Sequence, residues 1–310
     1  MENSTTSIPP YSIIDDPQPS DSLWTQFAEA VRSEWWRDSD NTLFTLMPNL
    51  CTTRAVFAQT KKDDQLMGCV IWHETKSLAY IAYYYVKKEL RGNGLGTKLW
   101  NRAMERILKE LVVGLRSGAS MSDYYKKKIT PFEAARYQKF NVSVDVLEQL
   151  FLIRDLDEGR FEKFTRFDEK VTGSERSAIL KKLFELETSE GSVLIDKNRG
   201  VRGKIIAHAA VVETGNKGGF EFKLSQLYCE NVHQAAIVIQ PLLEFCKKSH
   251  EHPTVLINVR LGTQGEDLEL SPDSVEVMDA DPFPMLFSRE HKLPFDLGKV
   301  WLEPNVNLLA

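Results

Sequence analysis

Residues 83 to 100 read YYYVKKELRGNGLGTKLW, and this stretch decides the fold. It begins as an aromatic run, passes through charged residues into a glycine-rich turn, and continues as an amphipathic helix. Glycines let a backbone approach a ligand closely, and the first N–H groups of a helix have no acceptor within the helix. Together with the helix dipole, these N–H groups attract anions. The stretch therefore predicts a strand, a phosphate-binding turn and a helix.

The spacing of the glycines separates three schemes for binding a phosphate group. The dinucleotide fingerprint is G-x-G-x-x-G, but Gly96 comes one residue too early for it. The P-loop requires G-x-x-x-x-G-K-[ST], whereas Gly96 is followed by Thr97 and then Lys98. The spacing that is present is Arg-x-x-Gly-x-Gly, with Arg91 and Gly94 as its first two members. The turn thus differs from both nucleotide motifs.

The residues around the turn predict a mixed sheet with helices packed on it. Four runs have the composition of strands, and residues 78–86 are apolar enough to be covered on both faces. These runs are residues 54–59, 66–73, 78–86 and 112–116. Apolar residues then recur at helical spacing at Leu95, Leu99, Ala103 and Ile107. This order of elements favours an α/β (α+β) fold.

The turn and its neighbours resemble the acetyl-coenzyme A loop of the GNAT superfamily of N-acetyltransferases. In that family the loop follows a strand that ends in Val and a short charged link, as Val86 and residues 87–90 do here. An earlier strand usually opens with Gly, as Gly68 does. The resemblance extends over about residues 11–153. It implies the GNAT fold, a mixed twisted sheet flanked by helices, and acetyl-coenzyme A (acetyl-CoA) as cosubstrate.

The resemblance also implies roles for individual residues. The backbone of Tyr84, Tyr85 and Val86 would pair with the pantetheine arm of the cosubstrate as an extra strand. The loop would hold the pyrophosphate with the amides of Arg91, Gly92, Asn93, Gly94, Leu95 and Gly96. The reaction would be attack on the thioester by a primary amine of a small molecule or a protein, whose identity is left open.

Such a reaction requires an acid for the leaving thiolate and a base for the amine. The resemblance points to Tyr125 as the acid, with Tyr137 as the alternative, and a packing role for either stays open. The base is left open among His73, Glu74, Tyr83 and Glu89. Because Lys128 stands where the family has Gly-Phe, a non-catalytic CoA-binding or scaffold protein that retains the GNAT fold is kept as the second hypothesis.

Beyond the charged residues 154–170, the order of elements partly repeats. Helices are expected at residues 175–187 and 233–248, and strands at residues 204–213, 220–228 and 254–260. This half resembles the degenerate second domain of bacterial tandem GNAT proteins of the YitH type and of a nematode-expanded family of unknown function. It contains no Arg-x-x-Gly-x-Gly sequence.

We therefore predict a chain of three consecutive parts. Residues 1–10 form a flexible N-terminus, residues 11–155 a GNAT acetyltransferase domain, and residues 156–310 a GNAT-like domain that lacks the cofactor loop. Residues 148–153 are expected to close the first sheet as a strand, and residues 281–284 to form a turn.

Composition excludes several classes of function. A net charge of −5 over 310 residues lacks the excess of Lys and Arg that a general nucleic-acid binder requires. No apolar run approaches the roughly 20 residues needed to cross a bilayer, so we expect a cytoplasmic protein without a membrane partner. The four cysteines are isolated and are expected to be buried, and His250 and His252 have no third ligand nearby, so no metal site is predicted. Oligomeric state is left open.

Overall fold

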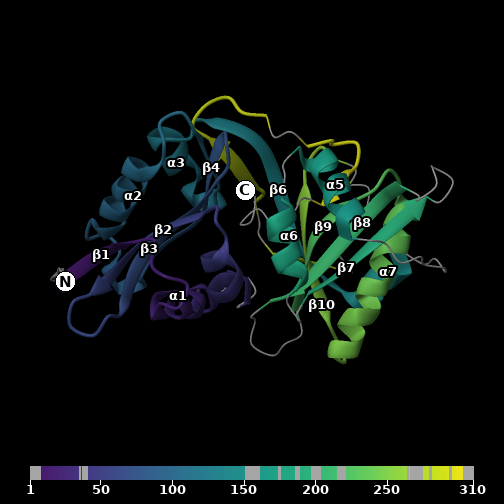
Figure 1. Cartoon of the computed structure of the whole chain (residues 1–310), viewed down its shortest axis with the longest axis horizontal. Coiled ribbons are helices and arrows are strands. Elements are labelled where there is room, and N and C mark those ends of the chain that lie inside the picture. The colour runs from purple at the N-terminus through teal and green to yellow at the C-terminus, as the bar shows by residue number, and fades with distance from the viewer. Residues whose placement is uncertain are drawn as a thin grey trace.

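The structure is a computed structural model in which residues 8–34, 36, 41–150, 161–173, 176–185, 189–196, 204–214, 221–263, 265, 275–278, 281–292 and 295–302 are described. Within these residues, thirteen strands join in one mixed sheet. Figure 1 shows two halves side by side, with β6 running between them. Part of the predicted flexible N-terminus, residues 1–7, lies outside the described residues.

The strands and helices follow one another in two similar series. The strands are β1 (Tyr11–Asp15), β2 (Thr53–Thr60), β3 (Leu66–Glu74), β4 (Leu78–Val86), β5 (Val112–Arg116), β6 (Phe132–Ser143), β7 (Ser189–Asp196), β8 (Lys204–Glu213), β9 (Glu221–Tyr228), β10 (Thr254–Arg260), β11 (Val275–Val277), β12 (Phe283–Phe287) and β13 (Val300–Leu302). The helices are α1 (Ser22–Ser33), α2 (Leu95–Arg106), α3 (Ser122–Lys128), α4 (Val144–Leu150), α5 (Phe161–Thr172), α6 (Ser177–Phe184) and α7 (Val232–Ser249). Short helical turns are η1 (Asn41–Leu46), η2 (Met47–Asn49), η3 (Lys88–Leu90) and η4 (Ala119–Met121).

The first half is a sheet covered on both faces. Strands β1 to β4 are antiparallel neighbours, and β5 is parallel to β4. Successive residues of a strand point to opposite faces. Accordingly, Phe57 of β2 belongs to the core under α1, whereas Val56 belongs to the core under α2. Helices α1 and α2 therefore cover opposite faces of the sheet (Figure 1).

The second half repeats this order. Strands β7, β8 and β9 are antiparallel neighbours, helix α7 follows, and β10 is parallel to β9. The strands expected at 204–213, 220–228 and 254–260 and the helix expected at 233–248 are confirmed to within one residue at each end. Helix α7 continues past Pro241. The same succession of elements thus occurs twice in the chain.

Each half is completed by a strand from elsewhere in the chain. The second part of β6, from Tyr137 to Ser143, pairs with β10, and its first part pairs with β12. Strand β12, close to the C-terminal end of the chain, also pairs with β5 and so completes the first sheet. Gly114 of β5 makes room for β12, since a Cβ atom at position 114 would lie 2.6 Å from the ring of Phe287.

Two expectations about this region are wrong, and a third, for a helix, is confirmed with shorter bounds. Residues 148–150 belong to helix α4 and not to a strand, because β6 and β12 already occupy the edge of the first sheet. The predicted turn at 281–284 gives way to β12, where Pro284 accepts a hydrogen bond from Ser117 N through its carbonyl (3.0 Å) and needs no N–H of its own. The helix predicted at 175–187 is shorter, and α5 precedes it within the charged stretch.

The predicted boundary at residue 155 lies between residues 151 and 160, outside the described residues. The division into two consecutive domains therefore stays a proposal. Any such division has to assign β12 to the first sheet, although β12 lies far along the chain.

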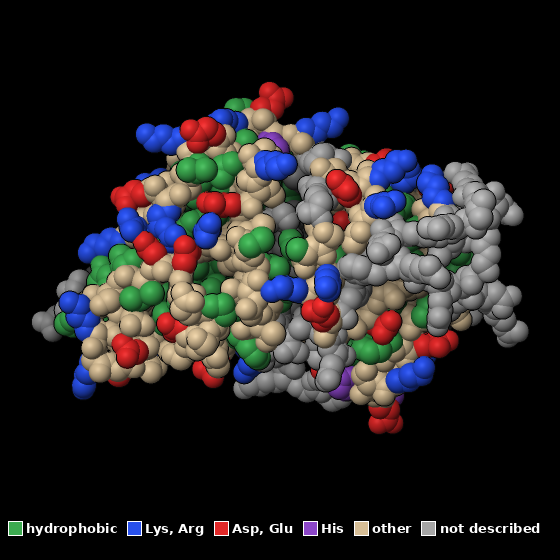
Figure 2. Space-filling view, viewed as in Figure 1, with side chains coloured by type: hydrophobic (Ala, Val, Ile, Leu, Met, Phe, Trp, Pro, Cys, Tyr) green, Lys and Arg blue, Asp and Glu red, His purple; other side chains and the backbone are tan. Residues whose placement is uncertain are grey.

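The surface of the first half carries both signs of charge. Figure 2 shows Lys and Arg side chains interspersed with Asp and Glu over the face in view. Several of them form ion pairs, such as that between Arg102 and Asp15 at 2.5 Å. Among the described residues, no helix is both long and apolar enough to span a membrane.

Candidate active site

Strands β4 and β5 separate at a bulge. They pair only from Leu78 to Ile81, which lie opposite residues 112–115. On the other edge of β4, Ile71 pairs with Tyr83 and Trp72 with Ile81, so Ala82 is an extra residue. A bulge of this kind bends its strand and reverses which face the next side chains take. Ile81 indeed lies in the core under α2, whereas Tyr83 lies in the core under α1.

Beyond the bulge, β4 presents an edge that β5 does not cover. Lys87 N donates to Met67 O at 3.0 Å, which sets the alternation of the β3–β4 ladder. By that alternation, the backbone groups of Tyr85 point toward β3. Those of Tyr84 and Val86 point toward the open edge. Of the three residues that the resemblance assigned to the pantetheine arm, these two can offer their backbone to it.

The glycine turn at the end of this edge has the geometry of an anion site. Gly92 and Gly94 both have a φ of +81°, a left-handed conformation that favours glycine, and Gly94 caps α2. The first N–H of α2 with an acceptor inside the helix is that of Lys98, which donates to Gly94 O at 3.1 Å. The preceding N–H groups, including that of Gly96, point out of the start of the helix. The loop therefore fits a diphosphate.

Gly96 also allows β4 and α2 to approach closely. A Cβ atom at this position would lie 2.3 Å from Tyr84 Oη and 3.2 Å from Val86 Cγ2. The absence of a side chain thus lets the Tyr84 hydroxyl lie against the first turn of α2. The predicted pantetheine edge meets the predicted pyrophosphate loop at this point.

The guanidinium of Arg91 holds the loop in place. Arg91 Nε donates to Val86 O at 2.8 Å, and Arg91 Nη2 donates to Glu34 Oε1 at 2.5 Å. Asn93 Nδ2 approaches Arg91 O at 3.5 Å. Arg91 therefore connects the loop to β4 and to the end of α1 through its side chain, while its backbone remains part of the anion site.

The two tyrosines proposed as the acid lie in different environments. Tyr125 belongs to a row of rings on the α2 side, in which Trp100 lies 5.5 Å from Tyr84 and 5.8 Å from Tyr125 between ring centroids. Burial raises the pKa of Tyr84 to about 12 and raises that of Tyr125 further, so both phenols are protonated at neutral pH.

Tyr137 is fully buried where the two halves meet. Its ring stacks on Phe283 with centroids 5.9 Å apart, and its hydroxyl lies 3.8 Å from Met285 Sδ. The structure thus groups Tyr125 with Tyr84, whose hydroxyl lies beside the glycine turn, and it places Tyr137 in the packing around β12.

Of the four residues among which the base was left open, Tyr83 is the one that lines the pocket described below. His73 is buried, with Nδ1 3.1 Å from Thr53 Oγ1. Glu74 accepts a hydrogen bond from Trp72 Nε1 at 2.8 Å. Glu89 is exposed and lies 3.6 Å from Lys87.

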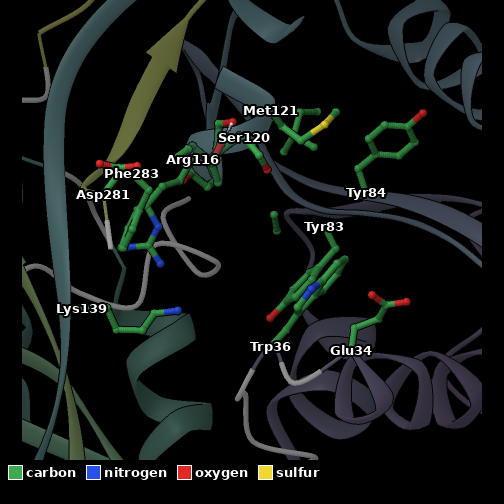
Figure 3. A pocket seen from close by; sticks show the side chains of 16 residues that line it. Glu34, Trp36, Tyr83, Tyr84, Arg116, Ser120, Met121, Lys139, Asp281 and Phe283 are labelled. Atoms are coloured by element: carbon green, nitrogen blue, oxygen red, sulfur yellow. Dashed lines mark hydrogen bonds between the residues drawn. The ribbon is translucent and has the colours of Figure 1, made fainter. Parts of the chain in front are cut away.

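A cavity of about 950 Å³ opens beside the split between β4 and β5. Trp36 stacks on Tyr83 along one side, with ring centroids 6.1 Å apart and an angle of 19° between the ring planes (Figure 3). The loop after β5, from Arg116 to Met121, forms another side. The cavity is completed by residues distant in sequence, namely Lys139 of β6, Asp281 and Phe283. Sequence reasoning missed all of these except Tyr83, because no local pattern connects them.

Two further expectations were that the chain holds no metal site and that its four cysteines are buried. His250 Nε2 lies 3.7 Å from Glu213 Oε1, and in the described part of the chain no group of three or more His, Cys, Asp or Glu residues is arranged to hold a metal ion. Cys69, Cys229 and Cys246 are buried, whereas Cys51 is exposed, so the expectation of four buried cysteines is wrong for that residue. Cys51 belongs to the short link between η2 and β2, which leaves it at the surface.

Comparisons with known proteins agree with this geometry. The model of the acetyltransferase (GNAT) family matches residues 17–120, which include α1, the split strands and the glycine loop. An uncharacterized protein of Caenorhabditis elegans, F36G3.2, is 30% identical over 305 residues, which span 95% of this chain and 96% of that protein. Holothin acyltransferase of Pseudoalteromonas sp. (strain SANK 73390) is 28% identical over 172 residues, 54% of each chain.

The fold of most of the chain also has a solved counterpart. A tandem GNAT protein from the clavulanic acid biosynthesis pathway superposes with a TM-score of 0.63 at 10% identity, covering 91% of this chain and all of that one. Residues 17–120 therefore contain a GNAT acetyltransferase domain, and the chain has the fold of a tandem GNAT protein. The domain and the similarity to an acyltransferase support acyl transfer in general.

Proposed function

We propose that the protein is an acetyl-CoA-dependent N-acetyltransferase that acetylates a primary amine. The observation that carries the proposal is the open edge of β4, because it leads directly into the glycine turn at the start of α2. An extended arm with amide groups can pair with such an edge as an added strand. A diphosphate at the end of that arm would then lie at the helix N-terminus.

We assign the residues of the chain to three tasks, namely binding the arm, binding the diphosphate and donating a proton. The backbone of Tyr84 and Val86 binds the arm, and the amides from Arg91 to Gly96 bind the diphosphate. Acetyl-CoA supplies an activated acetyl group as a thioester. Tyr125 carries a proton at Oη at neutral pH, as an ordinary tyrosine does, and burial raises its pKa further. This proton would go to the leaving thiolate.

The cavity would hold the amine on the opposite face of the sheet. Tyr83 and Trp36 line it on the α1 side, whereas the row of rings with Tyr125 lies on the α2 side. An amine in the cavity and an arm along β4 would therefore meet at the split. Asp281 and Phe283 bring the C-terminal part of the chain to the cavity, so we propose that this part shapes the acceptor site.

Two measurements test the proposal. Calorimetric titration is expected to show one acetyl-CoA site per chain, and a panel of amines is expected to release free thiol from acetyl-CoA. Tyr125→Phe is expected to lower kcat about 100-fold with an unchanged Kd for acetyl-CoA, because general acid catalysis contributes roughly 10² to 10⁴. Tyr124→Phe is the matched control, since Tyr124 is the exposed neighbour of Tyr125.

The outcomes are distinct. Absence of acetyl-CoA binding would overturn the proposal altogether. Binding without thiol release for any amine would favour the second hypothesis, a non-catalytic CoA-binding or scaffold protein. Equal losses in the Phe variants at 124 and 125 would remove the role assigned to the Tyr125 hydroxyl.

A further inference from the structure

Two cationic side chains lie near one aromatic ring, that of Phe283, where β12 lines the cavity. The guanidinium carbon of Arg116 lies 4.7 Å from the ring centroid of Phe283, and Lys139 Nζ lies 5.6 Å from the same centroid. Arg116 also lies 5.5 Å from the centroid of the Tyr137 ring. Figure 3 shows Arg116 beside Phe283, with Lys139 extending toward the cavity. These residues come from β5, β6 and β12, so the fold brings them together from three separate strands.

The stacking fixes Arg116 without using its hydrogen-bonding capacity. A guanidinium that stacks on an aromatic face keeps its N–H donors available in its own plane. In the part of the chain that the structure describes, no carboxylate forms an ion pair with Arg116, in contrast to Arg91, which is paired with Glu34. Arg116 is therefore a positioned donor with spare N–H groups at the wall of a cavity.

An Arg116 side chain with spare N–H donors at the wall of the cavity favours an anion. Asp281 also lines the cavity, but among the described residues it forms no ion pair with Arg116. Glu34 lines the cavity as well, and its charge is balanced by Arg91.

The anion in question is separate from the phosphates of the cosubstrate. Leu115 faces the core under α2, where the glycine loop lies, and Arg116 follows it in the strand. Successive residues of a strand point to opposite faces, so Arg116 points to the other side of the sheet. Its stacking on Phe283 and Tyr137, which belong to a different core cluster, agrees with this direction.

We propose that the acceptor is an amine that also carries a carboxylate, and that Arg116, held by Phe283, binds this carboxylate. The inference rests on the proposed function for its acetyl transfer and goes beyond it by naming the substrate class. A guanidinium offers two parallel N–H groups that match the two oxygens of a carboxylate. The aromatic wall of Trp36 and Tyr83 then faces the part of the acceptor between the two charged groups.

The test compares amines in matched pairs that differ only in the carboxylate. Phenylalanine is paired with 2-phenylethylamine, and 6-aminohexanoate with pentylamine, so that two distances between amine and carboxylate are sampled. For at least one pair, wild type is expected to show a kcat/KM at least about tenfold higher for the carboxylated member, the effect of a hydrogen-bonded charge pair. Arg116→Gln is expected to bring this ratio within about twofold of one.

Lys62→Gln provides the control for loss of one positive charge, because Lys62 lies in the exposed turn between β2 and β3. It is expected to keep the ratio of wild type. A wild-type ratio near one for both pairs, or a ratio that survives Arg116→Gln, would overturn the inference.

A binding measurement separates this inference from the proposed function. If acetyl-CoA binds but no amine releases thiol, the proposed function fails. Calorimetry of the same amine pairs with the CoA-saturated protein then decides the inference. Binding that requires the carboxylate and is lost in Arg116→Gln supports it, whereas equal binding or no binding of the paired amines overturns it.

Discussion

In both halves of the molecule, two central parallel strands pair at one end and separate at the other. The gap between the separated strands is open in the first half and filled by another strand in the second. In the first half, β4 and β5 pair at one end and then separate, and the edge of β4 beyond Ala82 stays open. In the second half, β9 and β10 pair from Glu221 to Lys223 and then separate as well. There the chain fills the split with its own strand β13, which pairs with both β9 and β10. A segment of the protein thus occupies the place that corresponds to the proposed site of the pantetheine arm.

The helix that follows the split differs in a consistent way. Helix α2 begins at Gly94, which is left-handed and has no side chain to cap the helix. Helix α7 begins at Asn231, whose side chain accepts the N–H of Gln234 at 3.0 Å. The second helix therefore satisfies its own N-terminus, whereas the first leaves its N–H groups for a ligand. The same fold thus leaves the split open in one half, where we propose a cofactor site, and fills it with its own chain in the other.

The interior of the second half is closed by a polar network. Arg176 Nη2 donates to Asp168 Oδ1 at 2.5 Å and also contacts Gln226 and Tyr228 of β9. Gln226 in turn lies 2.7 Å from His208 Nε2. All five side chains are buried, so this face of β9 is filled, in contrast to the cavity beside β4.

The largest expected effect concerns the glycine turn. Gly94→Trp is expected to weaken acetyl-CoA binding more than about 100-fold, because the left-handed backbone disfavours any side chain and the indole would lie at the mouth of the anion site. Calorimetry measures the change. Gly118→Ala is the control, since Gly118 has a negative φ and open space around it, and it is expected to bind as wild type does. Undiminished binding by the Gly94 variant would place the cofactor site elsewhere.

The packing of β12, a strand near the C-terminal end, against β5 of the first half is tested by a double-mutant cycle. Gly114→Ala is expected to lower the free energy of unfolding by about 2 kcal/mol, because its Cβ would overlap the Phe287 ring. Adding Phe287→Leu removes the overlap, so the double variant is expected to lose less than the sum of the single losses. Denaturation in urea measures each value. Strictly additive losses would mean that β12 does not pack on Gly114.

The closed network of the second half predicts a dependence of stability on pH. Burial lowers the pKa of His208 from 6.5 to about 3, so below pH 6.5 the unfolded chain binds a proton that the folded chain does not. Stability from this residue is complete above pH 6.5 and falls as the pH drops toward 3, by up to about 1.4 kcal/mol per pH unit. Urea denaturation at pH 7 and pH 5 measures the slope.

Two variants isolate this contribution. His208→Gln is expected to flatten the slope, whereas His233→Gln, at an exposed position on α7, is expected to leave it unchanged. An identical slope in all three proteins would assign the pH dependence to other groups.

The sequence predicted the local elements of both halves and missed how they are joined. The strand from Leu78 to Val86 and the strand from Val112 to Arg116 have the predicted bounds, because each has its own apolar pattern and its own stop signal. Strand β6 has no comparable pattern, since it lies between partners that are more than 100 residues away along the chain.

The same distinction applies to the site. The loop from Arg91 to Gly96 is a local motif, and its spacing alone was sufficient to single it out. The cavity depends on Arg116, Lys139, Asp281 and Phe283, which meet only after β12 has entered the first sheet. Strand β13 carries no sign in its three residues that it will fill the second split, because that role follows from the position of its partners.

Amide hydrogen exchange with and without acetyl-CoA tests the central claim most directly. It measures the protection of backbone N–H groups at the split between β4 and β5 and at the split between β9 and β10 in one experiment. The open first split predicts slower exchange at the N–H groups of Tyr84, Val86 and residues 92–97 when acetyl-CoA is present. The filled second split predicts unchanged exchange along β9 and β13. Protection that appears along β9, or that is absent from β4 and the glycine turn at saturating acetyl-CoA, would contradict the account.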